Sequence, residues 1–368
     1  MSDSLTQQAQ HWCARIVPQR IRELSRYKVS RYPGLIKLDA MESPYSWNDA
    51  EKKAWLDYLS TCAVNRYPDA TCSLLKSRFH QHLRLAPQCD LLFGNGSDEL
   101  IQLLLLSLFT PGDTLVDLVP GFVMYRHVAQ SIGYQYQPVA LNPDFSIDLD
   151  ALLSALHRYQ PKILFLARPN NPTANAFSWQ SITQIITASP GLVILDEAYG
   201  GFCADHGLEL LQQYPNVLVL RTMSKMGLAG LRFGLLIGHQ SWLRQWDKVR
   251  LPYNINSLTQ ASMQFALAHI TTIQQHTQTI CASRDAVLPT LAALPQLQVF
   301  PSQTNFILLR CCTMTADIWF QRFLDAGILV KNLHGTHPLT QQCLRISIGT
   351  AEENQQVIHT IKQAVAHA

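Results

Sequence analysis

The chain has 368 residues, of which 47% are hydrophobic and 15% are charged, and its formal net charge is +3. This composition excludes a disordered chain, and the length allows one large and one smaller domain with a sizeable core. So small and dispersed a net charge gives no sign of a nucleic-acid surface, and we expect no nucleic-acid partner.

The cysteines and the N-terminus indicate a cytoplasmic protein without a metal site. None of the nine cysteines forms a CxxC pair, and the adjacent Cys311 and Cys312 have the wrong spacing for a metal clasp, so reduced thiols are expected. The stretch MSDSLTQQAQHW has no basic region followed by an apolar core, and we expect no secretory signal. The longest apolar run, residues 100–109, is too short to cross a bilayer and predicts a buried helix.

Short apolar runs alternate with helical patterns from Asp90 to about Gly238. The candidate strands are DTLVDLV, YQYQPVAL, KILFLA, GLVILD, VLVLRT and RFGLLIG. This alternation is typical of βαβ units around a mainly parallel sheet. Ligands gather at the carboxyl ends of such strands, so the loops PGF, RPNNPTAN, DEAYGGF and MSKMG are the places to look for chemistry.

Beyond about Leu258 the pattern changes to long helical stretches and then to VFPSQTNFILLR and CLRISIGT, which predict a second sheet. Thr350 and Glu353 have capping-box spacing, so the tail closes as a helix. We therefore expect an N-terminal segment, 1–44, that docks on the small domain, a large domain at 45–258, and a small domain at 259–368.

Two polar groups follow predicted strands in the large domain. In GNGSDELIQLL a turn of small residues leads into a helix, and backbone N–H groups beside the Ser97 hydroxyl would form an anion site; an ordinary helix cap is the alternative. Asp196 ends VILD, and Tyr199 lies three residues further on. Such a carboxylate can keep a pyridinium nitrogen protonated, while a tyrosine can donate to a phenolate oxygen. A Walker-B-like acid is disfavoured because the chain has no GxxxxGK[ST] loop.

The stretch RTMSKMGLAGLRFG places Lys225 just beyond a strand, between small and hydroxyl residues. A desolvated lysine there could form a Schiff base with an aldehyde cofactor, whereas a surface lysine more usually sits among other charges. Thr222, Ser224 and Arg232 suit a phosphate.

Two further side chains are unusual for their positions. Asn171 lies in a polar turn after a buried strand, where its amide could donate to a ring oxygen or simply form the turn. Arg345 interrupts the apolar strand CLRISIGT and needs an anionic partner, either a substrate or a structural ion pair.

Taken in order, GSDE, PNNPT, DEAY, SKMGLAGLRFG and RISIGT resemble the pyridoxal-phosphate-dependent aminotransferases of fold type I. KLDAMESPY, NRYPDA and PGFVMY make the chain most similar to the histidinol-phosphate branch of that superfamily, and the likeness covers about residues 20–360. The resemblance implies an α/β fold, with a mainly parallel seven-stranded sheet flanked by helices in the large domain and a smaller α+β domain.

The resemblance also implies roles around a bound pyridoxal phosphate. Lys225 would form the Schiff base and act as general base, and Asp196 would pair with the ring nitrogen. Tyr199 and Asn171 would donate hydrogen bonds to the ring oxygen, and Phe122 would stack on the ring face.

The remaining implied roles concern phosphate, substrate and partner. The phosphate cup would be lined by Ser97, Asp98, Thr222, Ser224 and Arg232. Tyr67 of NRYPD would reach the cofactor phosphate of a partner subunit, which implies a homodimer with shared active sites. Arg345 would grip the anionic end of the substrate, with Lys331 as a second cation; a solvated lysine is the alternative for Lys331.

The implied reaction is reversible amino transfer between histidinol phosphate and 2-oxoglutarate, giving imidazole acetol phosphate and glutamate in histidine biosynthesis. An aromatic or broad-specificity aminotransferase and a threonine-phosphate-type decarboxylase are alternative activities. A ligand-sensing domain of a transcription regulator is the non-enzyme alternative, although only about forty residues precede the scaffold and no helix-turn-helix pattern is present. This chain departs from the family pattern at three places. Ser43 and Ala174 stand where the family often has asparagine and glycine, and PGF replaces the frequent PTY.

Overall fold

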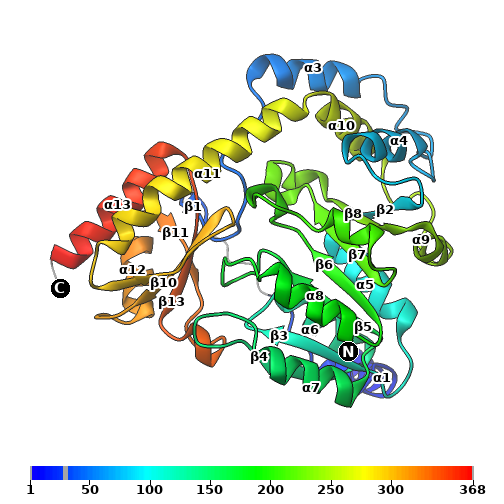
Figure 1. Cartoon of the computed structure of the whole chain (residues 1–368), viewed down its shortest axis with the longest axis horizontal. Helices are drawn as coiled ribbons and strands as arrows, with labels where there is room; N and C mark the ends of the chain where they lie inside the picture. The colour runs from blue at the N-terminus through cyan, green and yellow to red at the C-terminus, as the bar shows by residue number, and fades with distance from the viewer. Residues whose placement is uncertain (1, 28–31, 367–368) are drawn as a thin grey trace.

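The computed structural model describes residues 2–27 and 32–366, and its largest sheet has seven strands (Figure 1). Their spatial order is β2 (Cys89–Asn95), β8 (Phe233–His239), β7 (Val217–Thr222), β6 (Leu192–Asp196), β5 (Ile163–Ala167), β3 (Thr114–Val119) and β4 (Gln135–Ala140). β8 is antiparallel to both of its neighbours, and the other strand pairs are parallel. The mainly parallel sheet is confirmed. The sequence pattern missed β2 because its uninterrupted apolar run, Leu91–Phe93, is only three residues long.

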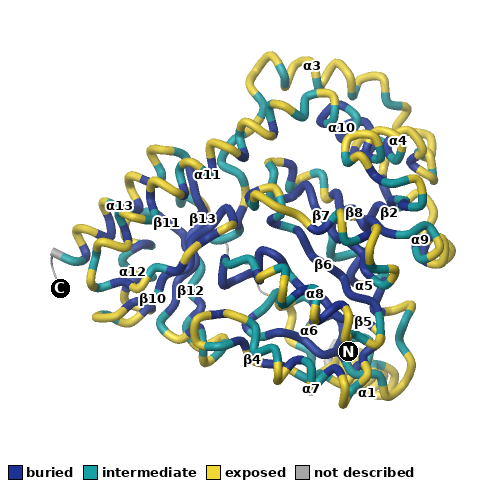
Figure 2. The backbone as a smooth tube through the Cα atoms, viewed as in Figure 1, coloured by how far each residue is buried: buried dark blue, intermediate teal, exposed yellow. Residues whose placement is uncertain are grey.

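Helices cover both faces of this sheet. One face carries α5 (Ser97–Leu108), α6 (Val123–Ile132) and α9 (Gln240–Asp247). The other carries α4 (Ser73–His82), α7 (Leu149–Tyr159), α8 (Trp179–Ala188) and α10 (Ser257–Ala268). Because successive side chains of a strand point to opposite faces, Leu192 and Ile194 enter one core while Val193 and Leu195 enter the other. Burial of each of these side chains contributes about 1.5–3 kcal/mol to the stability of the fold. The central strands are accordingly coloured as buried in Figure 2.

The predicted buried helix at residues 100–109 lies within α5. Leu100, Ile101, Leu104 and Leu105 are almost fully buried, at helical spacing on the face toward the sheet. Among the described residues, no helix is long and apolar enough to cross a membrane.

The C-terminal region has its own antiparallel sheet. The strand order is β12 (Lys331–Asn332), β13 (Cys343–Ser347), β10 (Phe306–Cys311) and β9 (Leu297–Val299). Three helices pack there, α11 (Ile270–Ala292), α12 (Ala316–Asp325) and α13 (Ala351–Ala366), and the long α11 leads from α10 into this region (Figure 1). The predicted capping box is confirmed: Glu353 N donates to Thr350 Oγ1, and Thr350 N donates to Glu353 Oε2.

The N-terminal segment contacts both regions. β1 (Ile36–Lys37) pairs in parallel with β11 (Ile328–Leu329) of the C-terminal region, whereas Arg20, in α2 (Gln19–Arg22), donates through Nε to Ser131 O at the end of α6. The contact of Arg20 with α6 comes in addition to the predicted docking of 1–44 on the small domain, which stays a prediction. Residues 1 and 28–31 lie outside the described residues, as do 367–368 of the range 259–368. The boundaries at 45 and 259 stay predictions.

The remaining elements are short or peripheral. They are α1 (Ser2–Ile16), α3 (Asp49–Leu59) and the 3-10 turns η1 (Gly200–Phe202), η2 (Leu208–Gln212), η3 (Ser224–Met226), η4 (Ala229–Leu231) and η5 (Pro338–Thr340). α3 packs on α10 at the edge of the molecule, and much of it is exposed in Figure 2.

Candidate active site

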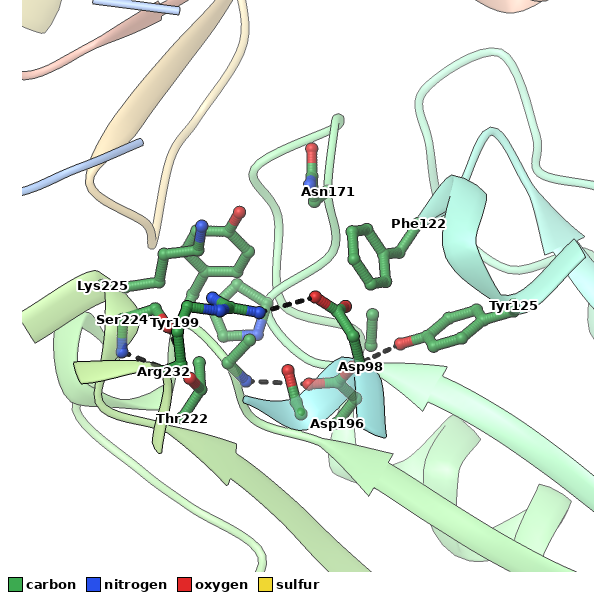
Figure 3. A pocket seen from close by; sticks show the side chains of 14 residues that line it. Asp98, Phe122, Tyr125, Asn171, Asp196, Tyr199, Thr222, Ser224, Lys225 and Arg232 are labelled. Carbon is green, nitrogen blue, oxygen red and sulfur yellow. Dashed lines mark hydrogen bonds and ion pairs between the residues drawn. The ribbon is translucent and has the colours of Figure 1, made fainter. Parts of the chain in front are cut away.

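A pocket lies at the carboxyl ends of β5, β6 and β7, beside the N-termini of α5 and α6 (Figure 3). Most of the predicted site residues line it: Ser97, Asp98, Phe122, Asn171, Asp196, Tyr199, Thr222, Ser224, Lys225 and Arg232. They come together because parallel strands present their carboxyl ends at one edge of a sheet, so loops far apart in sequence meet there. Within the described residues, no group of His, Cys, Asp or Glu is arranged to hold a metal ion.

Asp196 forms the floor of the pocket at the end of β6 and is only 3% exposed. One carboxylate oxygen accepts a hydrogen bond from the Tyr125 hydroxyl at 2.5 Å, and the other accepts from the Ala198 N–H at 2.9 Å. Burial raises the pKa of Asp196 to about 6, while the Tyr125 hydrogen bond opposes that rise. A carboxylate destabilised in this way would gain most from a cationic ring nitrogen in the pocket.

Lys225 sits in η3, directly after β7, and points into the same pocket (Figure 3). Burial lowers the pKa of its amine to about 8, and the positive charge of Arg345 adds to that effect. Much of the amine is therefore neutral at mildly alkaline pH, which is the form that attacks an aldehyde. Its Nζ lies 5.8 Å from the centroid of the Tyr199 ring.

Asn171 and Tyr199 also line the pocket and can present hydrogen-bond donors to it. The Asn171 side-chain oxygen accepts a hydrogen bond from Arg345 Nη1 at 2.5 Å, which turns its amide NH₂ away from the guanidinium. No described residue hydrogen-bonds that NH₂ group or the Tyr199 hydroxyl. Burial raises the pKa of Tyr199, so its hydroxyl stays protonated and able to donate.

The other end of the pocket is an anion site. Gly96 caps α5 with φ +80° and offers no side-chain cap, so the first N–H groups of the helix remain open to an external anion. The hydroxyls of Thr222 and Ser224 lie 2.9 Å apart beside it. Arg232 Nη2 contacts Asp98 Oδ2 at 3.0 Å, and both side chains are about half exposed.

The ion pair with Arg232 bears on the role predicted for Asp98 in the phosphate cup. A carboxylate repels phosphate, so the Asp98 side chain is suited to orienting Arg232, while its backbone N–H belongs to the anion site.

Two glycines allow the close approach of Arg232 to α5. A Cβ on Gly96 would lie 2.5 Å from Arg232 Nη2, and a Cβ on Gly234 would lie 2.5 Å from both Gly96 C and Ser97 N. The backbone between Lys225 and Arg232 reverses at Gly227, with φ +92°, and Arg232 itself has φ +49°. Gly230, in contrast, has open space around it. The turn that brings Arg232 back toward the pocket therefore requires a glycine at position 227, and nothing in the surroundings of Gly230 requires one there.

Arg345 and Lys331 come from the antiparallel sheet. Arg345 is 8% exposed in the middle of β13, and besides Asn171 it donates through Nη2 to the backbone oxygen of Asp39. Lys331 is its direct cross-strand partner on β12, so their Cα atoms lie about 5 Å apart and their side chains leave the sheet on one face. Neither residue lines the pocket itself; Arg345 joins it through Asn171.

Tyr67 does not reach this pocket. Its side chain is 81% exposed and stacks on Tyr253, with ring centroids 4.5 Å apart. Tyr125, conversely, lines the pocket although the sequence did not single it out. Its only signal was its position three residues after Phe122, which places both on one face of the first turn of α6.

The donors and charges of the pocket fit pyridoxal phosphate. Asp196 would hold a ring nitrogen, Asn171 and Tyr199 would donate to a phenolate oxygen, and the N-terminus of α5 with Arg232 would bind a phosphate. The amine of Lys225 points into the same pocket and would bind an aldehyde carbon.

Solved structures with the same fold include aminotransferases and decarboxylases. Histidinol-phosphate aminotransferase from Clostridium acetobutylicum matches with a TM-score of 0.83 and 20% identity, covering 91% of this chain and 100% of that one. The enzyme from Sinorhizobium meliloti, determined in complex with pyridoxal-5'-phosphate, matches with a TM-score of 0.83 and 24% identity, covering 95% and 98%. The fold and the site define a pyridoxal-phosphate-dependent enzyme of fold type I.

Sequence relatives narrow this class to a family. Residues 34–361 match the family described as aminotransferase class I and II. Histidinol-phosphate aminotransferase 2 of Nitrosococcus oceani is 46% identical over 95% of this chain and 97% of the relative, and histidinol-phosphate aminotransferase of Chromobacterium violaceum is 40% identical with the same coverage. The chain belongs to the class I and II aminotransferase family and is a pyridoxal-phosphate-dependent enzyme. The fold class, enzyme class and cofactor predicted from the sequence are confirmed.

Proposed function

We propose that this enzyme transfers an amino group between histidinol phosphate and 2-oxoglutarate, giving imidazole acetol phosphate and glutamate, in histidine biosynthesis. The names of the relatives at 40–46% identity support this substrate pair. The observation that carries it in this chain is the pair of cations, Arg345 and Lys331, side by side on one face of the antiparallel sheet.

The chemistry is divided among the pocket residues. Bound pyridoxal phosphate supplies an aldehyde that takes up the amino group and a ring that accepts the electron pair released at the substrate carbon. Lys225 holds the cofactor and carries the proton that leaves the amine-bearing carbon. Asp196 keeps the ring nitrogen protonated, and Asn171 and Tyr199 donate to the ring oxygen. Phe122, at the N-terminus of α6, packs on the ring face.

The substrate site must accept two kinds of anion in turn. Histidinol phosphate brings a phosphate, whereas 2-oxoglutarate and glutamate bring carboxylates. A planar guanidinium binds either anion through two parallel hydrogen bonds, and a neighbouring ammonium adds charge without a fixed geometry. Lys331 forms no ion pair with any described residue, so its charge is open to the substrate.

Substrate preference tests the proposal. We expect kcat/KM for histidinol phosphate to exceed that for histidinol by about a hundredfold or more, because histidinol lacks the phosphate and leaves Arg345 and Lys331 without an anion to bind. We also expect phenylalanine to be a poor amino donor. Equal use of phenylalanine would replace the proposal with a broad-specificity aminotransferase. Release of carbon dioxide from threonine phosphate would replace it with a decarboxylase.

We also infer a homodimer with shared active sites. Tyr67 and Tyr253 form an exposed aromatic pair, and Val64 and Leu251 are 74% and 72% exposed, an apolar surface of the kind that subunit contacts bury. Tyr67 does not reach the pocket of its own subunit, so it would contribute to the pocket of the partner subunit.

Subunit mixing tests this arrangement. Lys225→Ala and Tyr67→Ala proteins should each be weakly active, and mixed dimers should regain activity because one site per dimer then carries neither change. A mixture no more active than its components, or a monomer in light scattering, would overturn the inference.

A cytoplasmic location belongs to the same proposal. All nine cysteines have free thiols, including the buried Cys72, Cys89 and Cys343, which is the state expected in a reducing compartment. Fractionation of cells should recover the protein with cytoplasmic markers; recovery in a periplasmic fraction would refute the location.

A further inference from the structure

Tyr125 is the one side chain that hydrogen-bonds Asp196 within the described residues. Its hydroxyl donates to Asp196 Oδ2 at 2.5 Å, while a backbone N–H, that of Ala198, serves Oδ1. Tyr125 is 2% exposed, so its hydroxyl is shielded from bulk water, and such buried polar groups are normally hydrogen-bonded within the protein.

The Tyr125 ring is held from two sides. It stacks on Phe165 of β5, with centroids 4.5 Å apart and planes inclined by 12°, and it meets Phe122 edge-on at 5.4 Å and 84°. Burial and the charge of Asp196 raise its pKa well above the usual value, so the hydroxyl remains a donor. Both the direction and the proton of this hydrogen bond are therefore fixed by packing.

The other charged neighbours of Asp196 act against its ionised form. Asp98 and Glu197 both raise its pKa by repulsion, as does burial, whereas the Tyr125 and Ala198 hydrogen bonds lower it. Without the Tyr125 hydroxyl, Oδ2 would be a buried acceptor with no donor. The carboxylate would then rotate or take up a proton, and in either case its pairing with a ring N–H would weaken.

We propose that Tyr125 is a positioning residue that fixes the Asp196 carboxylate, in its ionised form, against the ring nitrogen of pyridoxal phosphate. This inference rests on the assignment of Asp196 to the ring nitrogen in the proposed function. Tyr125 also packs on Phe122, so the first turn of α6 sets both the face and the nitrogen edge of the ring.

Binding of two cofactors to the apoprotein tests the proposal. Pyridoxal phosphate has the ring nitrogen, and its carbocyclic analogue has a C–H group there instead. Tyr125→Phe keeps the stacked ring and removes only the hydroxyl. We expect its Kd for pyridoxal phosphate to rise about tenfold or more, because the lost hydrogen bond is to a charged group. Its Kd for the analogue should stay within about twofold of the wild-type value.

Tyr134→Phe is the matched control, since the Tyr134 hydroxyl is also buried but donates to Leu105 O, remote from the pocket. It should leave both Kd values unchanged. Equal losses for the two cofactors in Tyr125→Phe would mean that Tyr125 is only structural, and no loss for either would also overturn the proposal.

The Asp196→Asn variant distinguishes loss of the Tyr125 hydrogen bond from a general weakening of the core. In Asp196→Asn protein, Tyr125→Phe should change the Kd for pyridoxal phosphate by less than about twofold, because the partner of the hydroxyl has lost its charge. A further tenfold loss in that background would contradict the proposal. None of these measurements uses an amino donor, so they are independent of whether histidinol phosphate is the substrate.

Discussion

The parallel and antiparallel sheets contribute to the active site in different ways. On the parallel sheet, Asp196 and Lys225 stand at the ends of strands or in the loops after them, and they meet because the strand ends coincide. On the antiparallel sheet, Arg345 and Lys331 stand within strands, and they meet because the register sets them opposite each other. In the proposed function the first arrangement binds the cofactor and the second binds the substrate, so the two functions should be largely separable by mutation.

One hydrogen bond joins the two sets. Arg345 Nη1 donates to the Asn171 side chain, which orients the amide that faces the cofactor. Substitutions at Arg345 should therefore disturb both cofactor and substrate, whereas Lys331 offers a change confined to the substrate side.

The largest effect is expected for Lys225→Ala. Turnover should fall by about 10⁴-fold, since the variant loses both the amine that holds the cofactor and the proton carrier. Reduction with borohydride followed by mass spectrometry should show cofactor fixed to the wild-type protein and none on the variant. Lys362→Ala, in the exposed part of α13, is the control and should behave as wild type. Cofactor fixed covalently to the Lys225→Ala protein would contradict the assignment.

Asp196→Asn should weaken cofactor binding about a hundredfold or more, because it removes one partner of a buried ion pair.

Without cofactor, the same substitution should have a favourable effect, on the stability of the apoprotein. Burial raises the pKa of Asp196 from 3.8 to about 6, so the folded chain binds a proton more tightly than the unfolded chain. The stability that this tighter proton binding adds to the folded apoprotein is fully present below pH 3.8 and is lost as the pH rises toward 6. At higher pH the buried, charged carboxylate destabilises the folded apoprotein.

At pH 8 the Asp196→Asn apoprotein should therefore be more stable than the wild-type apoprotein, by on the order of 1–3 kcal/mol. Denaturant unfolding of both apoproteins at pH 8 measures the difference. A clearly less stable variant apoprotein would show that the carboxylate is already well stabilised without a cofactor.

Gly234→Ala tests the close packing at the anion site. The added methyl group meets the backbone of Gly96 and Ser97, so we expect a loss of about 1–3 kcal/mol in stability and weaker cofactor binding. Gly230→Ala lies in the same segment with nothing within 4 Å of the new methyl group, and it should be neutral. Thermal unfolding of both variants, with and without cofactor, makes the comparison. Equal behaviour would mean that the approach of β8 to α5 is not required.

Lys331→Met should have the smallest and most selective effect. It removes one ammonium from the substrate side, so KM for histidinol phosphate should rise about tenfold. The Kd for pyridoxal phosphate and the kcat should change by less than about twofold, because Lys331 does not line the cofactor pocket. Lys362→Met is the matched control. A loss of cofactor affinity in Lys331→Met would show that the two sheets are not separable.

Features that depend on local sequence were predicted well. The run VILD indicated both the buried strand β6 and the acid at its end, and Thr350 with Glu353 indicated the start of α13. β2 was missed because its short apolar run ends at Gly94, next to the turn that leads into α5. Local patterns fix where a side chain stands on its own element.

Features that depend on packing between elements were not predictable. The Tyr125–Asp196 hydrogen bond requires the first turn of α6 to lie near the carboxyl end of β6, and nothing near either residue encodes that approach. The register places Lys331 opposite Arg345 across a long connection between β12 and β13, and the turn of Arg232 toward Asp98 depends on the approach of β8 to α5. Apart from Tyr125, the sequence indicated these groups but not which of them touch.

We propose that the cofactor pocket and the two cations together make this enzyme an aminotransferase for histidinol phosphate. The direct test is a titration of the wild-type enzyme, loaded with pyridoxal phosphate, with histidinol phosphate and no keto acid present. We predict complete conversion of the bound cofactor to its pyridoxamine form, followed by its absorbance, and recovery on addition of 2-oxoglutarate. An enzyme that histidinol phosphate leaves unchanged but phenylalanine converts would contradict the claim.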